Sequence, residues 1–83
     1  MHILILGAAG MVGRKLTERL AKDGALGGTP IARATLHDVV MPEAPADAPF
    51  PSKTLASDFA LPGEAEKLVA ERPDVIFHLA AIV

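Results

Sequence analysis

Three glycines near the N-terminus are the residues whose types and spacing point most clearly to chemistry. The sequence opens MHILILGAAGMVG, so an apolar run is followed by Gly7, Gly10 and Gly13. Where a strand is followed by a helix, such glycines allow a tight turn, the approach of a ligand to the backbone and close packing of helix on strand. The pattern predicts a loop that binds a diphosphate. The alternative is a glycine-rich turn that binds no ligand.

The start of the helix after these glycines supplies the binding groups. Free N–H groups near Met11 and Val12 lie at the positive end of the helix dipole, where an anion is favoured. The spacing G-x-x-G-x-x-G differs from the G-x-G-x-x-G of many dinucleotide-binding domains. It also lacks the Gly-Lys-Ser/Thr ending of a P-loop. A diphosphate is therefore the ligand expected at the start of this helix, and neither motif is matched in full.

Asp38 is the second candidate, in the stretch TLHDVV. Dinucleotide-binding domains carry an acidic residue about 20 residues beyond the glycines, at the end of the second strand, for the adenosine ribose. A carboxylate there accepts hydrogen bonds from the ribose diol and repels a 2′-phosphate, and Val39, not Arg, follows it. These features favour NAD over NADP. The alternative is an aspartate that only ends a strand.

Two further segments follow predicted strands, where ligands bind in open α/β sheets. In LASDFALPG, Asp58 and the backbone of Phe59 are candidates for contact with the adenine, although Asp58 also fits a turn or the start of a helix. In VIFHLAAIV, Leu79, Ala80 and Ala81 follow the last strand. Small residues there allow the nicotinamide-side ribose and diphosphate to lie against the backbone.

Strands that alternate with helices must position these residues. The pattern predicts strands over 2–6, 34–40, 53–56 and 75–79, and helices over 11–22 and 63–72. Such alternation indicates an α/β fold with a parallel sheet and right-handed crossovers. The prediction is the N-terminal part of a Rossmann-type, doubly wound parallel sheet with about four strands and two main helices.

Periodicity also predicts which side chains face the core. Val12, Leu16 and Leu20 share one face of the first helix, and Leu68 and Val69 are expected to point inward from the second. The segment MPEAPADAPFPS contains four prolines, which exclude a helix or a central strand. It is expected to be an extended surface loop.

Composition excludes several classes of function. The formal net charge is −2, so there is no basic excess to bind nucleic acid. No apolar stretch is long enough to cross a bilayer, and no signal peptide is evident, so the expected location is cytoplasmic. The chain has no cysteine, and its three histidines are scattered among strand residues without metal-ligand spacing. We expect no metal site.

Taken in order, ILGAAGMVG, LHDVV, SDF and FHLAAIV resemble the extended short-chain dehydrogenase/reductase family, in the branch of NAD-dependent epimerases and dehydratases. Within that branch, GAAGMVGRKLTERLAKDG and TLHDVVMP are most similar to sugar-acid dehydrogenases. The resemblance implies NAD as cofactor and assigns each group of candidates a part of it. The diphosphate falls to Gly7, Gly10, Met11, Val12 and Gly13, the adenosine ribose to Asp38, the adenine to Asp58 and Phe59, and the middle of the cofactor to Leu79, Ala80 and Ala81.

The resemblance also shows what these residues do not include. Family members use a Tyr as general acid/base, with a Lys four residues after it, and this sequence contains no Tyr. The chain is therefore expected to bind NAD but not to catalyse by itself. Residues 1–83 are predicted to be a partial NAD-binding domain, and the apolar residues up to the last position favour a fragment. The intact protein would be an NAD-dependent oxidoreductase acting on a secondary alcohol of a sugar acid or nucleotide sugar, and a homodimer is one expectation for it. The alternative is a non-catalytic NAD-binding module with a regulatory or redox-sensing role.

Overall fold

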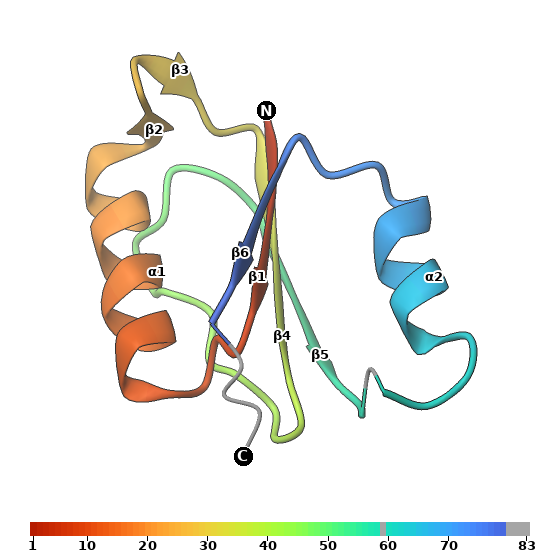
Figure 1. The fold of residues 1–83 in the computed structure, drawn as a ribbon. Coiled ribbons are helices and arrows are strands. Elements are labelled where there is room, and N and C mark those ends of the chain that lie inside the picture. Colours follow the sequence, from red (N-terminus) through yellow and green to blue (C-terminus); the bar gives the residue numbers. More distant parts are fainter. Residues whose placement is uncertain (59, 80–83) are drawn as a thin grey trace.

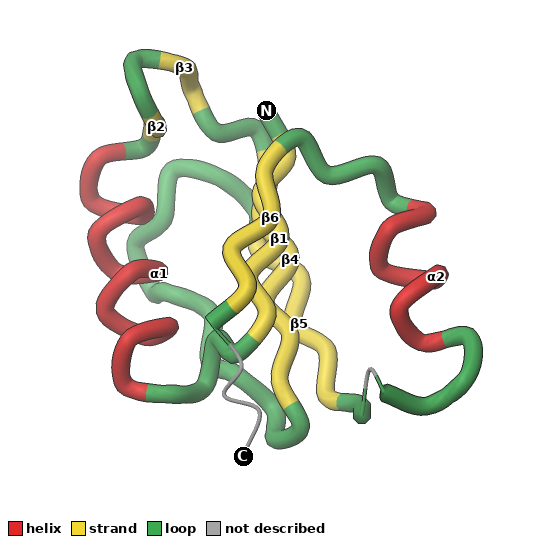
Figure 2. The backbone as a smooth tube through the Cα atoms, viewed as in Figure 1, coloured by secondary structure: helices red, strands yellow, loops and turns green. Residues whose placement is uncertain are grey.

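A computed structural model describes residues 1–58 and 60–79. The chain forms a central sheet with one helix on each side (Figure 1). Loops connect the strands to the helices around the edges of the sheet (Figure 2). In chain order the elements are β1 (His2–Leu6), α1 (Met11–Asp23), β2 (Ala25–Leu26), β3 (Thr29–Pro30), β4 (Arg33–Asp38), β5 (Ser52–Ala56), α2 (Glu64–Ala70) and β6 (Val75–His78).

The main sheet has four parallel strands in the order β5-β4-β1-β6. Because β1 lies at the centre and later strands add on both sides of it, the sheet is doubly wound. The α/β fold class and the Rossmann-type arrangement predicted from the sequence are confirmed. Parallel strands of this kind are buried on both faces, which explains the continuous apolar run of β1.

The register aligns the carboxyl ends of all four strands. Leu6 lies beside both His37 and His78, and Asp38 lies beside Ala56. Each strand is therefore followed by its loop at the same edge of the sheet, the lower edge in Figure 1. This edge carries those of the residues singled out from the sequence that the structure describes.

The core lies mainly between the sheet and α1. Side chains of successive strand residues point to opposite faces, so Ile3 and Ile5 share a face while Leu4 points to the other. All three are buried. The cluster on the α1 side consists of Ile3, Ile5, Ala8, Leu20, Ile31, Ala34, Leu36 and Phe50.

Two predicted inward positions on the helices are wrong. In α1 the buried residues are Gly13, Thr17 and Leu20, and Val12 is 66% exposed. The helix is rotated because the side without a Cβ, at Gly13, is the side that packs against the backbone of Gly7 and Ala8. In α2, Leu68 is buried but Val69 is 57% exposed. A seven-residue helix has room for only a narrow buried stripe.

The connections also differ in part from the prediction. The glycine-rich segment after α1 contains a short antiparallel pair, β2 with β3, that was not predicted. Strand β4 ends at Asp38 instead of continuing to position 40, and the two valines that follow are exposed. The proline-rich segment lacks helix and strand over residues 41–51, as expected, but it is not wholly a surface loop, and its last residue, Ser52, begins β5. Pro42 and Phe50 are buried, and Phe50 belongs to the core.

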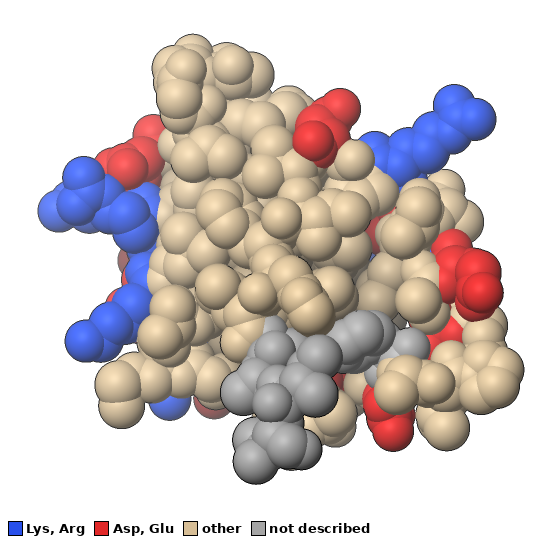
Figure 3. All heavy atoms as spheres, in the orientation of Figure 1, with Lys and Arg blue, Asp and Glu red and all other residues tan. Residues whose placement is uncertain are grey.

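Charge is distributed unevenly on the face shown in Figure 3. Several Lys and Arg side chains lie along the side of α1, whereas the surface over β6 is largely uncharged. None of the helices in the described part of the chain is long and apolar enough to cross a membrane.

Candidate functional site

The loop between β1 and α1 is held by main-chain hydrogen bonds. The N–H groups of Gly7 and Ala8 both donate to the carbonyl oxygen of His37, over 2.9 and 3.0 Å. The N–H of Gly10 donates to the carbonyl of Gly7 over 3.2 Å. Gly7 has a φ of +93°, a conformation that favours glycine. The first glycine thus makes the tight turn that the sequence predicts.

Gly13 and Gly10 serve different purposes. A Cβ at Gly13 would lie 2.1 Å from the carbonyl oxygen of Gly7 and 2.8 Å from the Cα of Ala8, so only glycine lets the helix approach the loop this closely. A Cβ at Gly10 would meet only the Gly7 oxygen, at 3.5 Å, an ordinary contact. The space beside Gly10 is open. Its exposed backbone is where a ligand could come close.

The N-terminus of α1 points into this open space. The N–H of Arg14 donates to the carbonyl of Gly10 over 2.9 Å and begins the helical series, so the N–H groups of Met11, Val12 and Gly13 precede it. No acidic residue lies in the first turn, and no side chain caps it. A bound anion could accept hydrogen bonds from these groups and benefit from the helix dipole.

Asp38 is the last residue of β4 and lies next to the loop between β1 and α1, residues 7–10, called the glycine loop below. Its Oδ2 accepts a hydrogen bond from the N–H of Ala9 over 2.9 Å, and its Oδ1 accepts one from the N–H of Val39 over 2.7 Å. The side chain is half-buried. A carboxylate has about four lone-pair sites, so these two bonds leave capacity for a ribose diol.

Asp58 follows β5 at the same edge. Its Oδ1 accepts a hydrogen bond from the N–H of Ala60 over 3.0 Å, and its carbonyl accepts one from the N–H of Leu61. The N–H of Ser57, one residue earlier, donates to the carbonyl of Asp38. Asp58 thus lies two residues beyond the end of β5 and closes a turn, while its contact with the adenine stays a prediction.

Leu79 follows β6, and its N–H donates to the carbonyl of Leu6 over 2.8 Å. The residue therefore lies beside the end of β1, directly before the glycine loop. Phe59, Ala80 and Ala81 lie outside the described residues. The predicted site residues that are described all end a strand, follow one or lie at the start of α1, at one edge of the sheet.

Two groups at this edge were not found from the sequence. The carbonyl of His37 and the N–H of Ala9 hold the loop against β4. Both belong to the main chain, which every residue has, so no sequence signal could single them out.

Buried histidines have polar partners. His2 Nε2 lies 2.8 Å from the Thr35 hydroxyl, and His37 Nε2 lies 2.8 Å from the Ser57 hydroxyl. Within residues 1–58 and 60–79, no group of three or more His, Cys, Asp or Glu side chains could hold a metal ion. His2 and His37 are thus built into the packing of the sheet.

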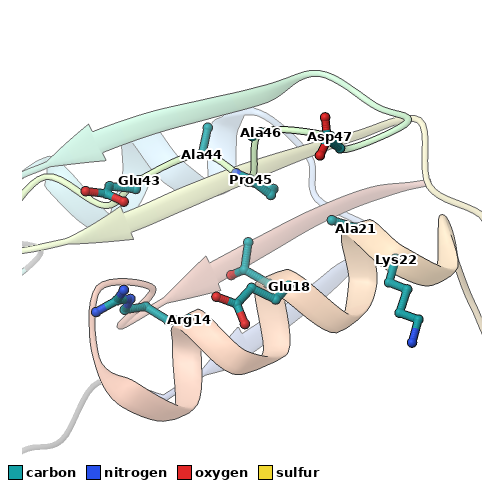
Figure 4. Close-up of a pocket in the computed structure, with 10 residues that line it drawn as sticks. Arg14, Glu18, Ala21, Lys22, Glu43, Ala44, Pro45, Ala46 and Asp47 are labelled. Carbon is teal, nitrogen blue, oxygen red and sulfur yellow. The ribbon is translucent and has the colours of Figure 1, made fainter.

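A hollow of about 520 Å³ lies away from the glycines, between α1 and the proline-rich segment (Figure 4). Arg14 and Glu43 lie near one end, and Lys22 and Asp47 near the other. Glu18 lies between these ends, and the remaining lining side chains are small: Thr17, Ala21, Ala44, Pro45 and Ala46. No residue of the glycine loop lines this hollow, and the lining residue nearest to the loop in sequence is Arg14.

The sequence profile of the NAD dependent epimerase/dehydratase family matches residues 3–83. The chain belongs to this family. The epimerase/dehydratase family is described as NAD-dependent, which confirms the predicted cofactor.

Three relatives of this epimerase/dehydratase chain are informative. D-erythronate dehydrogenase of Cupriavidus necator is 36% identical over 87 aligned positions, covering 100% of this chain and 26% of the relative. The crystal structure of a nucleoside-diphosphate-sugar epimerase from Agrobacterium tumefaciens matches with a TM-score of 0.95 and 66% identity, over 100% of this chain and 24% of that protein. A variant of uronate dehydrogenase from the same organism, solved in complex with NAD, matches with a TM-score of 0.71 and 30% identity, over 99% and 27%.

The resemblance to sugar-acid dehydrogenases that the sequence indicated is thus confirmed. The chain spans about a quarter of the length of these relatives.

Proposed function

We propose that residues 1–83 form the NAD-binding part of an oxidoreductase that acts on a secondary alcohol of a sugar acid or nucleotide sugar. The observation that carries this proposal is the open backbone at Gly10, beside the N-terminus of α1 and the carboxylate of Asp38. Membership of the epimerase/dehydratase family supports it. The names of the relatives, two sugar-acid dehydrogenases and a nucleotide-sugar epimerase, support the substrate class.

The diphosphate would lie against Gly10 and the N–H groups of Met11 and Val12. Gly7 and Gly13 would act by shape, the first through its turn and the second through close packing. The positive end of α1, with no acidic residue in its first turn, would favour the negative charge. The loop is already held in this form by bonds to β4.

Asp38 would bind the diol of the adenosine ribose. Its side chain is half-buried, with two of its lone-pair sites in use, so it can accept further hydrogen bonds. A carboxylate at this place repels a 2′-phosphate, which favours NAD over NADP. Asp58 and Phe59 as contacts of the adenine, and Leu79, Ala80 and Ala81 along the middle of the cofactor, stay predictions.

Bound NAD would supply a hydride acceptor for the oxidation of an alcohol. Removal of the alcohol proton needs a general base active near neutral pH. The chain has no Tyr, the residue that the family resemblance implies for this step. We therefore propose that these residues bind and orient the cofactor, and that the base belongs to a part of the protein outside them. A cytoplasmic location and a homodimer of the intact protein also stay predictions.

Calorimetric titration of the protein with NAD and with NADP tests the binding proposal. We expect saturable binding of NAD and weaker binding of NADP. Equal affinity for both would remove the role of Asp38 in cofactor choice. The absence of binding by a folded protein of full length would contradict the proposal as a whole.

An activity assay tests the proposal that residues 1–83 bind the cofactor but do not contain the catalytic base. Residues 1–83 alone, supplied with NAD and a panel of sugar acids that includes D-erythronate and a uronate, should form no NADH above a control without protein. Absorbance at the NADH band is the measurement. Sustained formation of NADH would show that the catalytic base lies within these residues.

A further inference from the structure

The glycine loop is tied to β4 at two successive points. Gly7 and Ala8 donate their N–H groups to the carbonyl of His37, and Ala9 donates its N–H to the carboxylate of Asp38. The first pair of bonds uses only main-chain atoms and depends on no side-chain group. The bond from Ala9 depends on one side chain.

The two oxygens of Asp38 have different partners. Oδ2 accepts the N–H of Ala9, a half-buried residue of the loop, over 2.9 Å, and Oδ1 accepts the N–H of Val39, an exposed residue, over 2.7 Å. If the Oδ2 bond were absent, the N–H of Ala9 would lose its partner in the described structure. An unpaired, partly buried donor is unfavourable, so the loop would have to shift to reach water.

We propose that Asp38 is a positioning residue for the diphosphate-binding loop, through its hydrogen bond to Ala9 and apart from any contact it makes with the ribose. This inference rests on the proposed function, because it assumes that the loop binds a diphosphate. Ala9 directly precedes Gly10, whose open side is the proposed binding surface. Displacement of Ala9 would move that surface.

The charge of Asp38 allows a positioning role to be distinguished from a purely electrostatic effect. A carboxylate beside a diphosphate repels it, so removal of the charge of Asp38 should by itself strengthen the binding of the diphosphate. A positioning role predicts the opposite. For a ligand whose ribose cannot bind Asp38, loss of the repulsion would raise the affinity, whereas loss of the positioning would lower it.

The test therefore uses an NAD analogue whose adenosine ribose lacks the 2′ and 3′ hydroxyls. The wild type, Asp38→Ala and Asp38→Asn are titrated with NAD and with the analogue by calorimetry. Asp38→Ala should bind the analogue about tenfold more weakly than the wild type, as expected for the loss of one hydrogen bond to a charged group. Asp47→Ala is the matched control, since it removes the same charge at the far end of α1 (Figure 4) and should change neither affinity.

Asp38→Asn separates the acceptor from the charge. Its one side-chain oxygen should go to Ala9, because the exposed N–H of Val39 can bond water instead. The analogue should then bind within about threefold of the wild type, or more tightly. NAD should bind both variants more weakly than the wild type.

Amide hydrogen exchange in the ligand-free protein tests the hydrogen bond between Ala9 and Asp38 directly. Asp38→Ala should speed the exchange of the Ala9 N–H about tenfold or more, while the N–H of Gly7, held by His37, stays protected. Unchanged exchange at Ala9, or equal affinity of Asp38→Ala and wild type for the analogue, would overturn the proposal. If Asp38→Ala fails to fold, Asp38→Asn decides: loss of Ala9 protection with no loss of affinity for the analogue would overturn the proposal. A wild type that binds no NAD would refute the proposed function, whereas the exchange measurement would still decide whether Asp38 positions the loop.

Discussion

A side chain at Gly13 would overlap the carbonyl oxygen of Gly7, because a Cβ built there lies 2.1 Å from that oxygen. The contact is between backbone and backbone, so no side chain can move to relieve it. Gly13→Ala should therefore lower the free energy of unfolding by about 2 to 3 kcal/mol. Urea denaturation followed by far-UV circular dichroism measures the change. Gly10→Ala is the matched control and should lose less than about 1 kcal/mol, since its Cβ has room. Equal losses in the two variants would contradict the close approach.

Gly10→Val should abolish NAD binding while leaving the fold intact. The added side chain would occupy the open space where the diphosphate is proposed to lie. Fluorescence of NADH upon titration with the protein measures binding directly, because the chain contains neither Trp nor Tyr to interfere. Circular dichroism checks the fold. NADH affinity equal to that of the wild type would argue strongly against this loop as the binding site.

Asp38→Ala should narrow the difference between NAD and NADP. The variant loses an acceptor for the ribose diol, worth about 1.5 to 3 kcal/mol, and it also loses a charge that repels a 2′-phosphate. NAD affinity should fall by roughly ten- to a hundredfold, and NADP affinity should fall less or rise. Calorimetry with both cofactors gives the ratio. A ratio unchanged from the wild type would remove Asp38 from cofactor choice.

Glu71 at the end of α2 should make stability depend on pH. The hydrogen bond from Lys53 Nζ, at 2.6 Å from Oε1, holds the pKa of the Glu71 carboxyl below its ordinary value of 4.5, with a further hydrogen bond from the Thr35 hydroxyl. Because the pKa is lower in the folded protein, this contribution is complete above 4.5 and is lost as the pH falls through the lower value. Glu71→Gln should cost about 0.5 to 1 kcal/mol at neutral pH, since the pair is partly exposed.

The stability difference between wild type and Glu71→Gln should shrink below pH 4.5. Urea denaturation at a series of pH values measures it. Glu66→Gln, an exposed position on the same helix, is the control and should show a smaller difference at neutral pH. A difference for Glu71→Gln that stays constant down to strong acid would contradict the ion pair.

Phe50 should be essential for stability although it lies in the proline-rich segment. Its side chain is 6% exposed and packs into the core cluster on the α1 side. Phe50→Ala should lower the free energy of unfolding by about 3 to 5 kcal/mol, through lost burial and the cavity that remains. Leu61→Ala, at an exposed loop position, is the control and should change it by less than about 0.5 kcal/mol. Thermal unfolding compares the two. A small effect at Phe50 would mean that the segment is a plain spacer.

Much of the fold follows from local patterns in the sequence. Strand β1 was predicted over its full range, because a short apolar run bounded by glycine has few other solutions. Helix α1 begins at Met11 as predicted, and it ends at Asp23, followed by Gly24, whose φ of +66° is the left-handed cap that glycine favours. The parallel sheet followed from the alternation of these elements.

Side-chain orientation was less predictable. An apolar residue such as Val12 suggests that its side of the helix faces the core. In α1 the neighbouring Gly13 faces inward instead, because the absence of a Cβ allows the closest contact. Similarly, prolines correctly excluded regular structure from residues 41–51, yet they said nothing about Phe50 entering the core. Such burial depends on a space formed by residues far away in the chain.

For the candidate site, the sequence by itself determined which residue types follow each strand: the three glycines after β1, the carboxylates of Asp38 and Asp58, and Leu79 after β6. Local signals are sufficient there, because glycines in a turn and acids at strand ends act through their own conformation and charge. Only the tertiary structure decided that these segments meet at one edge, since the register of parallel strands is fixed by long-range pairing. It alone also revealed the bond between Ala9 and Asp38. A main-chain N–H is the same in every residue, and only the packing of one loop against another strand gives it a particular partner.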